Sequence, residues 1–399
     1  MATIALVPDR PHRASLITRP LLLRFVSIFG AAASFYLPLS VVPMYAKSTG
    51  SNAAAGLSTG VLLLATVAVE LITPRLVART GYRVALAAGL FALGAPALAL
   101  LAAPSLPLIL AVSVVRGAGF AVVTVAGGAL TASMIPRERR GEGLALTGVV
   151  SGVPALLCLP MGVWAAARWG TAPVFVATAA AALLALVTVP GLPDHRTTAD
   201  RSAHGVLPML RNPAMTRPAA LFAASTMAAG VLVTFLPLAT TGKSAAVAAA
   251  ALFAQPAAST LSRLAAGRVG DRHGHVPLLA PGILLSAAGM AAIAATGTPS
   301  LVIGGAAVFG TGFGLLQNAT LALMYTRAAP AGYNMVSAIW NAAYDAGMGA
   351  GAIGMGLVTG HVGYPATFLL TAVLVLPALI CAGQEHASQH RSPGPRRQG

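Results

Sequence analysis

Long stretches of apolar residues without charge constrain the fold of this chain more than any other feature of its sequence. Residues 25–45 contain no Asp, Glu, Lys or Arg, and a helix of about 20 apolar residues is long enough to cross a bilayer. Eleven further stretches of similar character follow at 51–73, 84–101, 107–135, 143–167, 171–189, 218–240, 244–264, 276–295, 301–325, 334–358 and 364–382. The pattern predicts an all-α membrane protein with twelve transmembrane helices.

The composition excludes a water-soluble enzyme. Of the 399 residues, 57% are hydrophobic and only 9% are charged, whereas about 25% of residues are charged in soluble domains. Cys158 and Cys381 stand alone in apolar stretches, and the histidines are spread over predicted loops and tails. No spacing typical of metal ligands or catalytic groups occurs among them, so we expect no metal site, no cofactor and no catalytic residue. The positive charge is dispersed, so it does not predict a nucleic-acid partner.

The distribution of lysine and arginine predicts that both chain ends lie in the cytoplasm. Cytoplasmic loops of membrane proteins are enriched in these residues. With both termini placed inside, 21 of the 25 basic residues fall in cytoplasmic segments, and only Lys47, Arg168 and Lys243 fall in outer loops. We therefore expect a multi-pass protein of the plasma or inner cell membrane, surrounded by lipid.

A polar connection divides the predicted spans into two groups of six. The predicted organisation is a cytoplasmic tail at 1–19, a bundle at 20–189, a cytoplasmic linker at 190–217, a second bundle at 218–382 and a cytoplasmic tail at 383–399.

The two predicted bundles are related by an internal repeat. Gly-Ala-Gly-Phe at 117–120 recurs as Gly-Thr-Gly-Phe at 310–313, and Arg-Thr-Gly at 79–81 recurs as Arg-His-Gly at 272–274, both at an offset of 193 residues. Chance matches among glycine-rich helices are the alternative. The shared offset favours two parallel copies of one six-helix unit, an arrangement known for one class of transporters.

The loop after the eighth predicted span carries the motif Gly-Arg-Val-Gly-Asp-Arg-His-Gly-His at 267–275. This sequence resembles the signature loop of the major facilitator superfamily, and a degraded copy, in which Ala78 replaces the acid, occurs at 74–83. The resemblance covers essentially the whole chain and points to the drug/proton antiporter-like efflux permeases. It implies a gating role for six loop residues, namely Gly267, Asp271, Arg272, Gly274, Arg79 and Gly81.

The fifth predicted span contains Gly148-x-x-x-Gly152-x-Pro154 and later Pro160-x-Gly162. This pattern resembles the glycine and proline motif associated with antiporters, which implies export. The alternative is structural, because glycines allow close helix contact and a proline bends a helix whatever the direction of transport.

Two of the nine acidic residues, Glu70 and Asp345, lie within apolar spans. An ionisable group in such a position costs at least about 2.5 kcal/mol and usually marks an ion pathway, so both are candidate proton carriers. Asp345 lies about 16 Å deep at 1.5 Å per residue, and Asn341 precedes it by one helical turn as a candidate hydrogen-bond partner. A fixed ion pair or packing hydrogen bond is the alternative for Asp345, and pairing with loop arginines is the alternative for Glu70.

Arg116 in the fourth span needs a partner, because an unpaired guanidinium at that depth is too costly. We expect Asp345 or the substrate to be that partner, with a permanent role as a structural counter-ion as the alternative. Further polar and aromatic side chains of the tenth and eleventh spans are expected in a central cavity, with interhelical contacts as the alternative: Gln317, Asn318, Trp340, Asn341 and Tyr344.

The predicted function is proton-coupled efflux of small, partly apolar molecules by alternating access. In this hypothesis protonation of Asp345 weakens its attraction to Arg116, and the proton gradient supplies the energy to a monomeric carrier. An uptake permease or facilitator for a sugar or organic acid has the same architecture and is the alternative. A membrane-embedded enzyme is a remote second alternative, because no catalytic constellation is evident.

Overall fold

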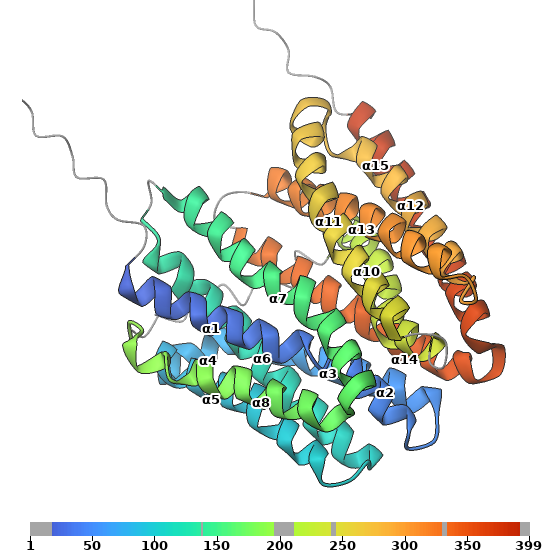
Figure 1. The fold of residues 1–399 in the computed structure, drawn as a ribbon. Helices are drawn as coiled ribbons and strands as arrows, with labels where there is room; N and C mark the ends of the chain where they lie inside the picture. The colour runs from blue at the N-terminus through green and yellow to red at the C-terminus, as the bar shows by residue number, and fades with distance from the viewer. Residues whose placement is uncertain (1–17, 137–138, 195–210, 241–244, 329–332, 392–399) are drawn as a thin grey trace, which may run out of the picture.

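The computed structural model describes residues 18–136, 139–194, 211–240, 245–328 and 333–391, and these residues form helices without any strand. The first bundle consists of α1 (Arg19–Tyr36), α2 (Val41–Lys47), α3 (Asn52–Glu70), α4 (Thr73–Thr80), α5 (Tyr82–Gly94), η1 (Ala95–Leu101), α6 (Leu106–Met134), α7 (Arg140–Trp169), α8 (Thr171–Leu186) and η3 (Val189–Gly191). The second consists of α10 (Pro213–Ala239), α11 (Ala245–His273), η5 (Val276–Leu278), α12 (Leu279–Ile293), α13 (Pro299–Arg327), α14 (Tyr333–Val375) and α15 (Ala378–Arg391). The two bundles lie side by side (Figure 1).

Eleven helical stretches among the described residues are long and apolar enough to cross a membrane. The last of them, Met335–Ser388, has 54 residues, which at 1.5 Å per residue is about 81 Å and far exceeds the bilayer core of about 30 Å. The helix breaks at Gly363, whose φ is +76°, a conformation that glycine adopts without steric cost. This stretch is therefore long enough for two passes.

The helix ends differ from the predicted spans mainly where helices continue into polar sequence. The breaks near 102–106 and 297–300 lie where the sequence predicts them, but α11 continues from the predicted end at 264 to His273. Similarly, α10 begins at Pro213, inside the predicted linker, and α15 continues to Arg391, inside the predicted tail. Hydropathy detects the apolar part of a helix and misses the turns that extend beyond it.

Helix contacts confirm the internal repeat. A Cβ atom on Gly117 would meet the carbonyl oxygen of Leu62 at 2.1 Å, and a Cβ on Gly310 would meet that of Gln255 at 2.2 Å. Both members of the second contact lie 193 residues after those of the first. Glycine is required at these positions because any side chain would separate the helices.

Backbone geometry gives the same offset. Gly81 and Gly274 have φ of +83° and +84°, and Gly170 and Gly363 have φ of +81° and +76°. Each pair is again separated by 193 residues, and the second pair lies in the turns that follow the fifth and eleventh predicted spans. The offset therefore applies to α7 and α14 as well as to the helices from which it was predicted.

The two bundles meet along two interfaces, α3 against α14 and α7 against α11. Near one end the α3–α14 interface is tight, since a Cβ on Gly56 would lie 2.2 Å from the carbonyl oxygen of Ala352. Thr234 Oγ1 donates to Thr59 Oγ1 at 3.1 Å close by. We call this the closed end, and it lies opposite the end at which α1 begins and α15 finishes (Figure 1).

Hydrogen bonds between the two bundles also stabilise the closed end. Ser40 Oγ donates to the carbonyl oxygen of Val233 at 2.6 Å, and Tyr364 Oη donates to Asn52 Oδ1 at 2.8 Å. Lys47 contacts the same tyrosine hydroxyl. Lys47, Asn52 and Tyr364 lie in or next to loops that the sequence analysis assigns to the outer side of the membrane. Ser40 and Val233 lie in the outer parts of the predicted spans 25–45 and 218–240.

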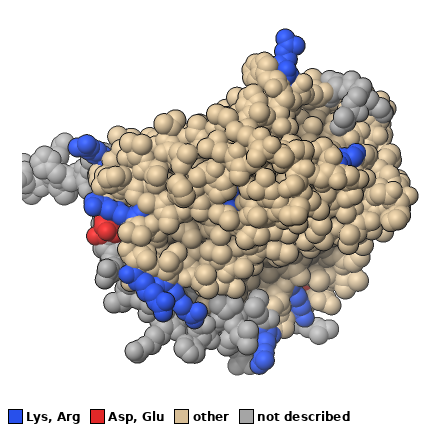
Figure 2. Space-filling view, turned by 90° about the horizontal axis from the view of Figure 1, so that it is seen from below, with Lys and Arg blue, Asp and Glu red and all other residues tan. Residues whose placement is uncertain are grey.

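Much of the molecular surface is uncharged, as expected of a surface that contacts lipid. Figure 2 shows a broad face of uncharged residues, with most of the visible Lys and Arg toward its left and lower edges. Trp164 and Trp169, near the closed end of α7, are 46% and 61% exposed and pack edge to face with ring centroids 5.0 Å apart. Exposed tryptophans are typical of the boundary between the bilayer and water.

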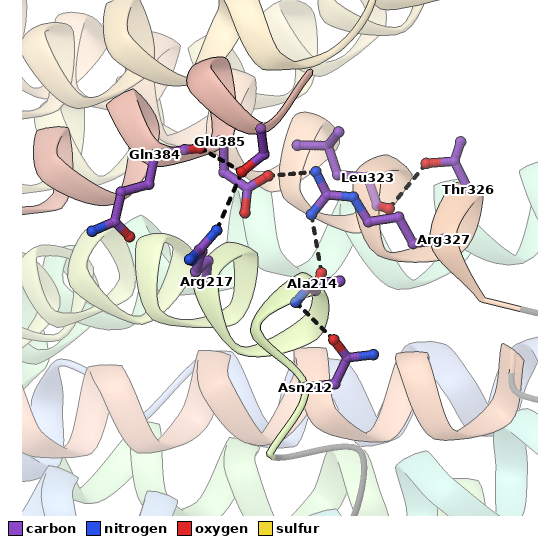
Figure 3. Close-up of polar contacts among 9 residues, drawn as sticks. Asn212, Ala214, Arg217, Leu323, Thr326, Arg327, Gln384 and Glu385 are labelled. Carbon is purple, nitrogen blue, oxygen red and sulfur yellow. Dashed lines mark hydrogen bonds and ion pairs between the residues drawn. The ribbon is translucent and has the colours of Figure 1, made fainter. Parts of the chain in front are cut away.

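A buried ion pair joins helices of the second bundle at the end opposite the closed end (Figure 3). Arg327 at the end of α13 pairs with Glu385 of α15 and donates to the carbonyl oxygen of Ala214 in α10 at 3.1 Å. Glu385 is 1% exposed, although the sequence places it in a tail. The pair therefore joins α10, α13 and α15 of the second bundle.

Removing one partner of this pair is expected to destabilise the protein. Glu385→Ala leaves the Arg327 guanidinium without its counter-charge, which costs about 3 kcal/mol in buried pairs. Thermal unfolding of the detergent-purified protein should show a lower Tm for Glu385→Ala. The double variant Arg327→Met with Glu385→Leu removes both charges and should recover most of the loss. An unchanged Tm in the single variant contradicts a stabilising role for the pair.

Candidate functional site

A cavity of about 530 Å³ lies between the two bundles, a volume typical of sites for small molecules. Its wall is formed by α1, α6 and α7 of the first bundle and by α10, α11, α13 and α14 of the second. Arg24, Thr131 and Thr147, toward the end of the molecule opposite the closed end, are part of this wall. The cavity is thus central and extends away from the closed end.

The cavity wall combines aromatic rings with one polar stripe. Tyr36, Phe120, Phe313 and Tyr344 contribute the rings, and Phe120 is stacked on Phe35 with centroids 3.7 Å apart. On α11 the polar side chains of Gln255, Ser259 and Arg263 all line the cavity. They are spaced by four residues, which places them on one face of the helix.

Asp345 lies directly beside this cavity. Its side chain is 6% exposed, and its neighbour Tyr344 lines the cavity. Asp345 forms no hydrogen bond or ion pair with any residue that the structure describes, including Asn341, which is exposed and outside the cavity wall. The alternative of a fixed ion pair is therefore not the arrangement observed.

The structure brings the two predicted proton carriers together. Glu70 at the end of α3 lies within electrostatic range of Asp345 on α14, because these helices form one of the two interfaces between bundles. Glu70 is partly buried, and within the described ranges it has no ion pair with the loop arginines. Two acids from different bundles thus share one apolar interface.

Arg116 has different partners from those predicted. Its guanidinium donates to the carbonyl oxygens of Leu93 on α5 and Ser34 on α1, the latter at 2.7 Å, and the side chain is 2% exposed. It is absent from the wall of the central cavity and does not pair with Asp345. Arg116 therefore joins three helices of the first bundle through backbone carbonyl oxygens, and it is not a counter-ion to any acid that the structure describes.

Two other arginines reach the cavity, and the sequence analysis counted both as loop residues. Arg24 is 3% exposed, and its guanidinium donates to Thr131 Oγ1 at 3.1 Å and Ser27 Oγ at 3.0 Å. Arg263 is exposed within the cavity and has no hydrogen bond or ion pair to another described residue. Arg24 directly precedes the predicted span 25–45, and Arg263 is the penultimate residue of the predicted span 244–264. This position at the end of an apolar run is the only signal the sequence offers for them.

The remaining predicted cavity residues divide into two groups. Gln317 and Tyr344 line the cavity. Trp340 stacks on Phe222 with centroids 4.3 Å apart and donates to Thr320 Oγ1 at 3.2 Å, so it packs within the second bundle. Asn318 lies outside the cavity wall and is directed toward Gly267 of α11.

The loop motifs lie at the ends of helices. Asp271 and Arg272 form the last turn of α11, where both are exposed and have no ion pair among the described residues. In the first bundle, where Ala78 replaces the acid, Asp194 approaches Gly81 and accepts a hydrogen bond from the backbone N–H of Arg83 at 3.2 Å. A carboxylate at the start of α5 is favourable because it faces the positive end of the helix dipole.

The glycines of α7 serve two purposes. A Cβ atom on Gly148 or Gly152 would meet no atom within 4 Å, and both residues line the cavity. A Cβ on Gly162 would lie 1.9 Å from the carbonyl oxygen of Leu37. Close helix packing therefore explains Gly162, whereas Gly148 and Gly152 leave open space in the cavity.

Comparison with known proteins identifies relatives for the whole chain. The model of the Major Facilitator Superfamily matches residues 24–254 and 219–398. The tetracenomycin C resistance and export protein of Streptomyces glaucescens is 32% identical over 123 residues, which cover 31% of this chain and 23% of that protein. The match therefore spans less than a quarter of that protein's length.

Solved structures show the same fold at low sequence identity. The nucleoside transporter NupG superposes with a TM-score of 0.72 at 14% identity, covering 92% of this chain and 99% of its own. A peptide transporter, POT, gives 0.74 at 15% identity, covering 96% of each chain. A bacterial homologue of the human lysosomal transporter Spinster, in an inward-facing and occupied conformation, gives 0.72 at 13% identity and covers 92% and 96%.

Proposed function

The chain belongs to the major facilitator superfamily and is a multi-pass transporter of the cell membrane, and on this premise we propose that it exports small, partly apolar molecules in exchange for protons. In this proposal twelve spans cross the membrane and both termini are cytoplasmic. The part of α14 before its break at Gly363 forms one pass, and the rest of α14 together with α15 forms the next. Export is supported by the Streptomyces glaucescens relative, which is described as a resistance and export protein.

The observation that carries the proposal is the position of Asp345. Asp345 is 6% exposed, lies at the interface between the bundles beside the cavity, and has no partner among the described residues. Burying an unpaired carboxylate costs free energy, and an apolar side chain would fill the same space without that cost. Ionisable groups retained in a membrane interior usually serve an ion pathway. A carboxyl that alternately binds and releases a proton accounts for this cost.

The proposed cycle uses the rocking of the bundles. In the proposed orientation, the closed end of the α3–α14 interface is the outer end and the cavity faces the cytoplasm. When the bundles rock, the outer end opens and Asp345 becomes accessible from the opposite side. A protonated Asp345 is uncharged and is buried again at lower cost than a carboxylate, so proton binding from outside favours return of the empty carrier. Substrate occupies the deprotonated carrier on its way out.

A deletion strain and everted vesicles test the proposal together. Hypersensitivity of the strain to a chemically diverse compound panel identifies transported compounds. In everted vesicles with an acidic interior, adding such a compound should release protons, seen as recovery of a quenched acidic-compartment dye. Accumulation of the compound without any proton release contradicts antiport and favours another mode of transport.

Glu70→Gln should retain proton-driven transport. Glu70 lies at the end of α3 and is only partly buried. We therefore expect its charge to influence proton binding at Asp345, which is itself the proposed proton carrier. We expect a rate loss below about tenfold, which corresponds to about 1.4 kcal/mol in the barrier. The measurement is proton-driven uptake into everted vesicles at equal protein content. Complete loss of uptake in Glu70→Gln contradicts this division of roles.

A further inference from the structure

The internal repeat relates two charged residues of opposite sign. Arg263 lies 193 residues after Glu70, and Asp345 lies 193 residues after Gly152. Glu70 therefore occupies in α3 the place that Arg263 occupies in α11. At the α3–α14 interface an acid faces an acid, whereas at the α7–α11 interface an arginine occupies the acid's place and a glycine replaces Asp345.

No acid of the described residues forms an ion pair with Arg263. Glu142 pairs with Arg139, Glu385 pairs with Arg327, and Asp194 lies at the start of α5. Asp271 is exposed two helical turns farther along α11. Glu70 and Asp345 belong to the α3–α14 interface. Tyr36 and Tyr344 lie within electrostatic range of both Asp345 and Arg263, but neither Asp345 nor Glu70 pairs with that arginine.

The second arginine of the cavity does not offer a comparable site. Arg24 is buried, and its guanidinium is held by Thr131, Ser27 and the carbonyl oxygen of Gly127. Arg263 is the exposed guanidinium, and Tyr36 and Tyr344 lie within electrostatic range of it. A guanidinium in a cavity with apolar walls binds an anionic group strongly, because water competes less there and the planar donors fit a carboxylate.

The space beside Arg263 fits a larger molecule. Gly148 and Gly152 leave the facing wall of α7 open, while Phe120 and Phe313 supply rings for an apolar body. We infer that the transported substrate is an organic anion with an aromatic or otherwise apolar body, whose acidic group binds Arg263 at the α7–α11 interface while the proton binds at the α3–α14 interface. This inference rests on the proposed transport function and names its substrate class.

Binding of two matched dyes to the purified full-length protein tests the inference without requiring transport. Fluorescein is anionic at pH 8, and rhodamine 123 has the same three-ring skeleton but is cationic. Fluorescence polarisation should show tighter binding of fluorescein than of rhodamine 123. Arg263→Gln should weaken fluorescein binding by about tenfold or more, the size expected for a lost charge-assisted hydrogen bond, and Arg263→Lys should restore part of it.

The controls separate this inference from the proposed function. Arg168→Gln removes an exposed arginine at the closed end of α7 and should leave fluorescein binding unchanged. Asp345→Asn should bind fluorescein but lose proton-driven uptake. Equal or tighter binding of rhodamine 123, absence of fluorescein binding to the unmodified protein, or full binding by Arg263→Gln each overturns the inference. Loss of coupling with anion binding intact leaves the substrate class standing and bears on the proposed function alone.

Discussion

Asp345→Asn is expected to abolish proton-driven transport while leaving binding in the cavity intact. The amide has nearly the same shape as the carboxyl and causes no packing defect, but it cannot bind and release a proton. Because Asp345 is 6% exposed and has no partner in the described part of the chain, no ion pair is broken by the change. Uptake into everted vesicles under a proton gradient should fall to the level of vesicles without the protein.

The informative control is exchange at equilibrium. Asp345→Asn should still exchange labelled for unlabelled substrate across the membrane without a gradient, because the loaded carrier needs no proton on residue 345 to change sides and an uncharged amide is buried at lower cost than a carboxylate. Asp345→Glu keeps a titratable group one methylene farther out and should retain partial coupling. Unchanged proton-driven uptake by Asp345→Asn would refute the assignment of the proton to this residue.

Gly56→Leu is expected to abolish transport by holding the outer end open. A Cβ at this position lies 2.2 Å from the carbonyl oxygen of Ala352, a backbone atom that cannot move aside without displacing α14. The larger side chain therefore forces α3 and α14 apart at the closed end, and the state described here becomes inaccessible. Transport should fall to background while the protein remains folded, because a separated outer end is a normal stage of alternating access.

Cysteine labelling reports the state of the closed end directly. Thr59 is 2% exposed and accepts a hydrogen bond from Thr234, so a Thr59→Cys reporter, with both native cysteines replaced, should react slowly with an impermeant maleimide. Adding Gly56→Leu should accelerate labelling from the outer side. Gly354→Leu is the matched control, since a Cβ there meets no atom within 4 Å. Slow labelling together with lost transport in Gly56→Leu would contradict this account.

The fold follows closely from the sequence because it depends on a strong physical signal. Apolar length and the scarcity of charge identify the spans, and the 193-residue offset predicts paired glycine contacts that the structure contains at Gly117 and Gly310. The sequence predicts the ends of the helices less accurately. The last turns of α11 and α15 are polar, and hydropathy contains no information on whether a polar segment continues a helix or leaves it.

The candidate site was only partly predictable, and the reasons are specific. Asp345 stands out because acids are rare within apolar runs. Arg116 was assigned the wrong partner because backbone carbonyl oxygens, which satisfy it here, are present at every residue and leave no mark in the sequence. Arg263 was missed because its position near the end of an apolar run is typical of a topology signal, and only the packing of α11 against the cavity distinguishes it.

The opposite charges at Glu70 and Arg263 carry an evolutionary consequence. Gene duplication gives both copies the same side chain at first, so at least one of these positions was substituted after the ancestral unit was doubled. If, as we propose, the proton binds at the α3–α14 interface and the substrate at the α7–α11 interface, selection for a new compound acts on α7 and α11 without disturbing the acids. In this arrangement substrate specificity can change while the residues that couple transport to protons stay the same.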